Sequence, residues 1–112
     1  MEYTRGDWRV GDPFHGCGDE IPIYGEDHHE LARVFIHNGE QFANARLIVT
    51  AVNACASVNV DNPMAVAKSI KAMFEALKAI TSQFSRVDKL YSRDNEIISQ
   101  AEQALAKAEE KL

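Results

Sequence analysis

The sequence contains few cysteines, prolines and tryptophans and no long apolar run. It contains two cysteines, Cys17 and Cys55, with three prolines and one tryptophan among 112 residues. Two cysteines give no disulfide framework and suit a reducing compartment. No apolar run approaches the roughly 20 residues that cross a bilayer. The first residues lack the basic region and apolar core of a signal peptide. We therefore expect a cytoplasmic protein with no membrane partner.

The motifs of common catalytic and binding chemistries are also absent. There is no Gly-x-Gly-x-x-Gly stretch and no Walker-type loop, which argues against a nucleotide site. No basic patch is large enough to neutralise several phosphates, so we expect no direct nucleic-acid binding. No third residue is identifiable that would orient a cysteine–histidine pair for nucleophilic attack. We expect a protein that is not an enzyme and has no cofactor.

The charge that is present is unevenly distributed. Residues 1–39 hold eight acids against three arginines, a net charge of −5, whereas residues 40–112 hold nine acids and nine bases. An acidic lobe of this kind could bind a basic surface of another protein, although a solvated face that keeps the protein soluble is the simpler interpretation. The candidate partner-binding acids are Asp19, Glu20, Glu26, Asp27 and Glu30.

The first third of the chain has the pattern of a small sheet. Turn residues separate three short segments with strand character, at 7–10, 21–24 and 31–36. Pro22 places the second segment at a sheet edge. A meander of two or three antiparallel strands cannot stand alone in water and must lay one face on a helix. Trp8, Tyr24 and Phe35 would then fill the core, with an exposed aromatic recognition surface as the alternative.

Helical periodicity begins after Asn38-Gly39. Apolar residues recur at helical spacing over about 40–57, with Cys55 on the apolar side as a small buried hydrophobe. The stretch 57–63 then interrupts this period. Asn62 before Pro63 is a good helix start, because asparagine caps free amide groups and proline is tolerated at the first helical position.

From Met64 to Leu112 there is neither glycine nor proline, and the apolar residues follow a heptad pattern. Thirteen of the fourteen positions spaced alternately by four and three residues are apolar, and Asp94 is the exception. This spacing keeps a seam in register with a supercoiled partner. The expected oligomer interface comprises Val66, Ile70, Met73, Leu77, Ile80, Phe84, Val87, Tyr91, Ile98 and Leu105.

The segment Ser92–Asn95 leaves two arrangements open, because three of its residues favour caps and turns. Either one helix of nearly 50 residues runs through it, which we favour, or the chain forms a hairpin of about 63–91 and 95–111. A single long helix could not cover its own apolar face and would need a second copy. The sequence predicts an α+β fold with a β-sheet and helix lobe at 1–60 and a coiled-coil or helical-bundle oligomerisation segment at 61–112.

One group of residues has the chemistry of metal ligands. His15 and Cys17 precede His28 and His29 in an acidic, turn-rich stretch. Neutral imidazole and thiolate are good zinc ligands, but this spacing matches no familiar zinc module and no Cys-x-x-Cys pair anchors it. A surface loop with incidental histidines is the simpler interpretation.

Two stretches carry a resemblance to a family. Tyr3-Thr4-Arg5-Gly6-Asp7-Trp8 resembles the Tyr-Thr-Pro-Gly-Pro-Trp opening of a large set of small uncharacterised proteins of tailed phages and prophages. Ala43-Asn44-Ala45-Arg46-Leu47-Ile48 resembles the Ala-Asn-Ala-Arg-Leu-Ile motif that opens their helix after a small sheet. Arg5 and Asp7 replace the two prolines. The resemblance covers roughly residues 3–52 and implies a bacterial host cytoplasm and an accessory role in infection.

These observations lead to three functional hypotheses. The first is a phage-type, non-enzymatic protein that self-associates through its C-terminal helices and binds a host protein. Inhibition of a host defence system, in the manner of an anti-CRISPR or another anti-defence protein, is one role open to it. The second is a structural or scaffold oligomer without an inhibitory target. The third is a small metal-binding protein that uses the histidine and cysteine cluster.

Overall fold

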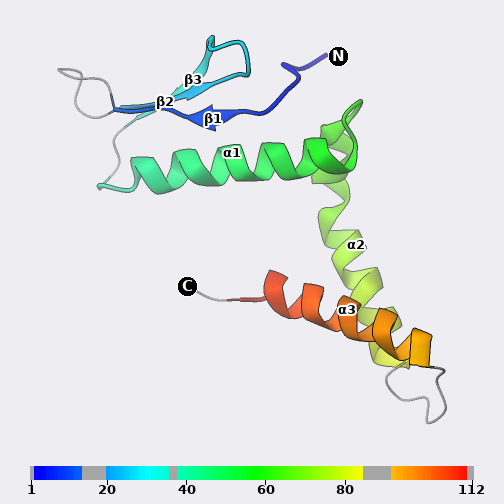
Figure 1. Ribbon diagram of the computed structural model, residues 1–112. Helices are drawn as coiled ribbons and strands as arrows, with labels where there is room; N and C mark the ends of the chain where they lie inside the picture. The colour runs from blue at the N-terminus through cyan, green and yellow to red at the C-terminus, as the bar shows by residue number, and fades with distance from the viewer. Residues whose placement is uncertain (1, 14–19, 36–37, 85–91, 111–112) are drawn as a thin grey trace. The chain divides into compact units, whose positions relative to one another are not determined.

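The computed structural model describes residues 2–13, 20–35, 38–84 and 92–110 (Figure 1). Its elements, in chain order, are β1 (Arg9–Val10), β2 (Ile21–Tyr24), β3 (Glu30–Val34), α1 (Gln41–Val58), α2 (Pro63–Phe84) and α3 (Ser92–Ala108). The chain divides into two compact units, residues 1–67 and 68–112. The first unit is a three-stranded antiparallel sheet packed on α1, which confirms the predicted α+β class and meander. No helix in the described ranges is long and apolar enough to cross a membrane.

The sheet has the order β1-β2-β3, so the proline-containing strand is central and not at an edge as predicted. Pro22 is accommodated because only its carbonyl is needed on the β1 side, where it accepts a hydrogen bond from the Gly11 amide at 2.9 Å. A side chain at position 11 would collide with the Pro22 ring and with the ring of Tyr24. Because Gly11 has no side chain, the chain at the end of β1 can approach β2 closely, even though Pro22 of β2 has no backbone N–H to donate.

The core of the first unit lies between β2 and α1. Ile21 and Ile23 lie two residues apart, so both side chains are on the face of the strand that meets the helix. There they pack with Ala45 and Val49. Trp8 packs at the edge of this cluster. The prediction that Phe35 lies in the core is wrong, because β3 ends at Val34 and the Phe35 side chain is 70% exposed.

The amide of Asn53 joins the N-terminal segment to α1. Its Oδ1 accepts from the Trp8 backbone N–H at 3.0 Å, and its Nδ2 donates to the Trp8 carbonyl at 2.9 Å. The Asn53 side chain thus makes the two hydrogen bonds that a neighbouring strand would otherwise make, and it satisfies both backbone polar groups of Trp8. Further along the same segment, the Tyr3 hydroxyl donates to the Val60 carbonyl at 2.7 Å, and Arg5 pairs with Asp61 at 3.2 Å.

The start of α2 follows the predicted rule. The helix begins at Pro63, and the Asn62 side-chain oxygen accepts from the Ala65 amide at 3.2 Å, which is an N-cap interaction. Cys55, near the end of α1, is buried as expected.

The single long helix that we favoured beyond residue 63 is wrong. Lys78 of α2 pairs with Glu109 near the end of α3 at 3.6 Å. In a continuous helix these 31 positions would separate the two residues by roughly 46 Å, at 1.5 Å per residue. The second unit is therefore a helical hairpin, the alternative arrangement. Asp94 does not fall in a turn between the helices but in the first turn of α3, where a carboxylate is favourable beside the helix N-terminus.

We expect Asn53→Ala to destabilise the first unit by about 1–3 kcal/mol, because the partly buried N–H and C=O of Trp8 would lose their partners. Urea denaturation followed by tryptophan fluorescence measures the change. Asn44→Ala is the matched control, since Asn44 lies on the same helix, is exposed and makes no side-chain hydrogen bond in the described region. Equal stability of the two variants would contradict the role assigned to Asn53.

Candidate functional site

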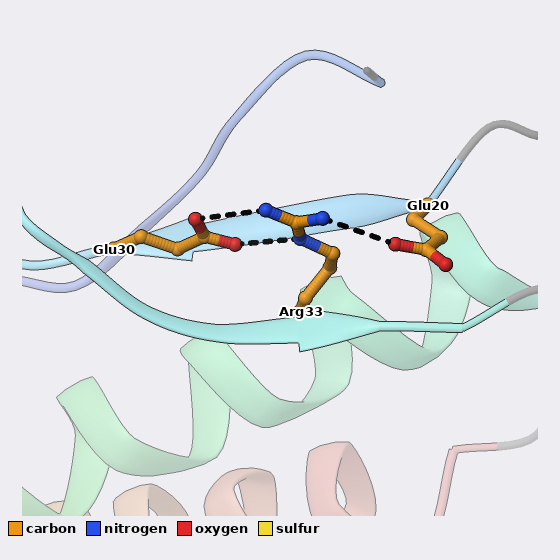
Figure 2. A network of polar contacts seen from close by, with 3 residues as sticks. All are labelled: Glu20, Glu30 and Arg33. Atoms are coloured by element: carbon orange, nitrogen blue, oxygen red, sulfur yellow. Dashed lines mark hydrogen bonds and ion pairs between the residues drawn. The ribbon is translucent and has the colours of Figure 1, made fainter. Parts of the chain in front are cut away.

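The outer face of the sheet carries a polar cluster formed by Arg33 and two of the predicted acids (Figure 2). The Arg33 Nε and Nη2 atoms donate to the two carboxylate oxygens of Glu30 at 2.8 and 3.2 Å, and Nη1 donates to Glu20 at 3.4 Å. In Figure 2 the guanidinium lies between the two carboxylates. The two-point contact with Glu30 is the strong, planar form of an arginine–carboxylate pair.

A β-bulge makes this cluster possible. Positions 30 and 33 would fall on opposite faces of a regular strand, because side chains alternate. The register between β2 and β3 shifts after Ile23, which pairs with Ala32, so that Tyr24 pairs with Glu30 and Leu31 is the extra residue. The extra residue brings Glu30 to the face that carries Arg33.

Arg33 also sets the ionisation of its partner. Its hydrogen bonds lower the pKa of the Glu30 carboxyl below the usual range, and those of Glu30 raise the pKa of the Arg33 guanidinium. Two carboxylates and one guanidinium leave a local net charge of −1. The acidic lobe is therefore weaker at Glu20 and Glu30 than a count of acids indicates.

The turn between β2 and β3 gives a third acid, Asp27, its own hydrogen-bond partner. Asp27 accepts from the His29 backbone N–H at 3.2 Å, and its second oxygen lies 2.8 Å from His29 Nδ1. The hydrogen bonds from the His29 side chain and backbone lower the pKa of Asp27. Of the five predicted acids, Asp19 lies outside the described residues, and Glu26 is exposed without an ion pair in the described part of the chain.

The two described histidines of the predicted metal cluster make other contacts. His28 has a positive φ of 68° in the turn, and its Nδ1 lies 2.8 Å from Arg9 Nη2. Because arginine only donates, this nitrogen must accept, and the proton of the neutral ring is then on Nε2. His15 and Cys17 lie outside the described residues. Among those described, no three histidine, cysteine or acidic residues are grouped as metal ligands.

The predicted oligomer seam divides into two sets. Leu105 is buried, and Val66, Leu77 and Ile98 are half-buried. Val87 and Tyr91 lie outside the described residues. The remaining four, all on α2, are exposed to 53%, 53%, 51% and 44%, and are Ile70, Met73, Ile80 and Phe84.

Sequence reasoning did not predict the one buried polar residue of α2. Thr81 is buried although it is polar, because its hydroxyl lies 2.9 Å from the Leu77 carbonyl oxygen and 3.0 Å from that of Lys78. A threonine that bonds back to the preceding turn hides its own polar group. Beside it is a solvent-open hollow of about 300 Å³, lined by Lys78, Thr81, Ser82 and Glu102.

Comparisons of this chain with protein-family models, with curated proteins and with solved structures find no match.

We expect the protein to lose stability in acid, with a contribution from Glu30. Its folded-state pKa is lowered, so the stabilisation is present above the unfolded pKa and is lost as pH falls, between about pH 5 and pH 3. The urea midpoint should fall over this range, and less steeply in Glu30→Gln. Arg33→Gln should flatten the profile in the same way, since it removes the cause of the shift. Parallel profiles for all three proteins would contradict the assignment.

Proposed function

We propose that the protein is a non-enzymatic interaction protein of the phage type that self-associates through its α2–α3 hairpin and binds a host protein through its N-terminal unit. The observation that carries the first part is the stripe on α2 formed by Ile70, Met73, Ile80 and Phe84, hereafter the α2 stripe. The second part is supported by the confinement of the net charge to residues 1–39 and by the resemblance of residues 3–52 to phage proteins.

The α2 stripe supports self-association because α3 leaves it uncovered. Thr81 and Leu105 are buried in the hairpin unit, whereas Ile80, which precedes Thr81, is 51% exposed. The exposed residues keep the heptad spacing that suits packing against another helix. Contiguous apolar surface of this kind commonly marks an interaction site.

The size of the expected gain is compatible with a reversible oligomer. Complete burial of a large apolar side chain contributes about 1.5–3 kcal/mol, so a half-exposed one can add roughly 1 kcal/mol. Four such residues from each of two copies provide on the order of 8 kcal/mol, which falls within the cost of association of about 4–15 kcal/mol. The stripe by itself therefore favours weak, concentration-dependent assembly.

The acids that could bind a partner are those of the N-terminal unit that do not belong to the Arg33 cluster. Glu26 in the β2–β3 turn is exposed, and so are Glu2, Asp7 and Asp12 of the N-terminal segment. None of these four makes an ion pair in the described part of the chain. A basic surface on a partner would meet these acids without first breaking an internal pair.

We expect the wild-type protein to be oligomeric at micromolar concentration and Ile80→Glu to be monomeric, because the variant would bury an unpaired charge at the interface. Sedimentation or light scattering gives the copy number. Ala79→Glu is the matched control, since it adds the same side chain at the neighbouring exposed position outside the stripe. A wild-type monomer at these concentrations would refute self-association through α2.

For the partner, we expect Glu26→Lys to reduce the amount of a specific host protein recovered with the tagged protein from lysate. Glu96→Lys is the control, because it makes the same charge change at an exposed position of α3. Charge reversal is preferable to deletion of residues 1–39, since their strands form the core with α1. If both variants recover the partner as the wild type does, the acidic surface is not the binding site.

A further inference from the structure

The helix α1 is unusual in being almost uncharged. Arg46 is its only charged residue between Gln41 and Val58. A helix that covers one face of a sheet normally turns charged and polar side chains to the other side. Here the sheet takes the side with Ala45 and Val49, and the opposite side is also apolar. A helix that is apolar on both sides is expected to be covered on both sides.

The side of α1 away from the sheet has four residues along its midline, Ala43, Leu47, Ala54 and Val58. All four are exposed, Leu47 to 69% and Val58 to 67%. They follow one another at spacings of four, seven and four, and Thr50 and Ala51 flank the gap in the middle. We call these six residues the α1 outer face. Asn44 and Ser57 lie at its edges and provide a polar rim.

The order of large and small residues on this face is self-complementary. A two-fold axis between positions 50 and 51 brings each residue i opposite residue 101 − i of an antiparallel second helix. Leu47 then faces Ala54, and Val58 faces Ala43, so that each large side chain meets a small one. Because alanine leaves space at the helix surface, the two backbones can approach closely while the larger residues fill the gaps. A two-fold contact requires this kind of self-matching patch.

We propose that the α1 outer face binds the same face of a second copy of this chain, with the two helices antiparallel about an axis between Thr50 and Ala51. We infer that the occupant is a second copy because the pattern of large and small residues fits its own reverse. Only an interface between two copies of the same face requires such a match. This contact is separate from the α2 stripe and does not depend on it.

The contact is expected to be weak when it acts alone. The helix is about 27 Å long at 1.5 Å per residue, and one helix pair of this length is short for a stable interface, which buries about 1,600 Å² in total. A second, independent two-fold contact through α2 would lead to an assembly with more than two copies.

Disulfide cross-linking in the full-length protein tests the arrangement. In a Cys17→Ser, Cys55→Ala background, Thr50→Cys should form a disulfide-linked dimer under mild oxidation, because residue 50 lies beside the axis and next to its own copy. Val58→Cys should not cross-link, since its two copies are 15 positions apart along the helix, roughly 22 Å, far beyond the span of a disulfide. Circular dichroism confirms that each variant is folded.

The controls separate this contact from the proposed function. Leu47→Glu should remove the Thr50→Cys cross-link, whereas Arg46→Glu, the neighbouring position outside the face, should retain it. Adding Ile80→Glu to Thr50→Cys should leave the cross-link in place, because the α2 stripe is not used. Equal cross-linking at positions 50 and 58 indicates a parallel or unspecific pair and overturns the proposal. Absence of cross-linking at both positions, as expected if the chain's own hairpin or another protein covers the face, also overturns it.

Discussion

The two-way hydrogen bond between the Asn53 amide and the Trp8 backbone is the contact on which the N-terminal unit depends. The strand β1 has only two residues and pairs with β2 on one side. So short a strand contributes too few backbone hydrogen bonds to fix the N-terminal segment by itself. Asn53 fixes the chain just before it, and Tyr3 and Arg5 fix it again at the loop after α1. The segment 3–8 is thus held to α1 and to the loop after it by side-chain hydrogen bonds and an ion pair.

Much of the first unit could be predicted from the sequence because its signals are local. The alternation at Ile21 and Ile23, the helical period after residue 40 and the cap at Asn62 each arise within a few residues. The central position of β2 could not be predicted, because it depends on the close approach of Gly11 to Pro22. Phe35 was misplaced because the end of β3 is set by pairing and not by residue type.

The second unit and the charged surface show where sequence patterns leave real ambiguity. A heptad run reports which residues form an apolar side, and it does so equally for one long helix and for a hairpin. The fold-back is decided by contacts such as Lys78 with Glu109, which are distant in sequence. Likewise, a count of acids cannot show that Arg33 holds both Glu20 and Glu30, since that depends on how the two strands are aligned.

The extra residue in β3 has a consequence for observing folding. Glu30 meets the guanidinium only when Leu31 is the unpaired residue and Ile23 lies opposite Ala32. A strand displaced by one position would turn this carboxylate to the helix side, away from the guanidinium that lowers its pKa. The ionisation of Glu30 therefore reports in solution whether β2 and β3 are aligned in the native register.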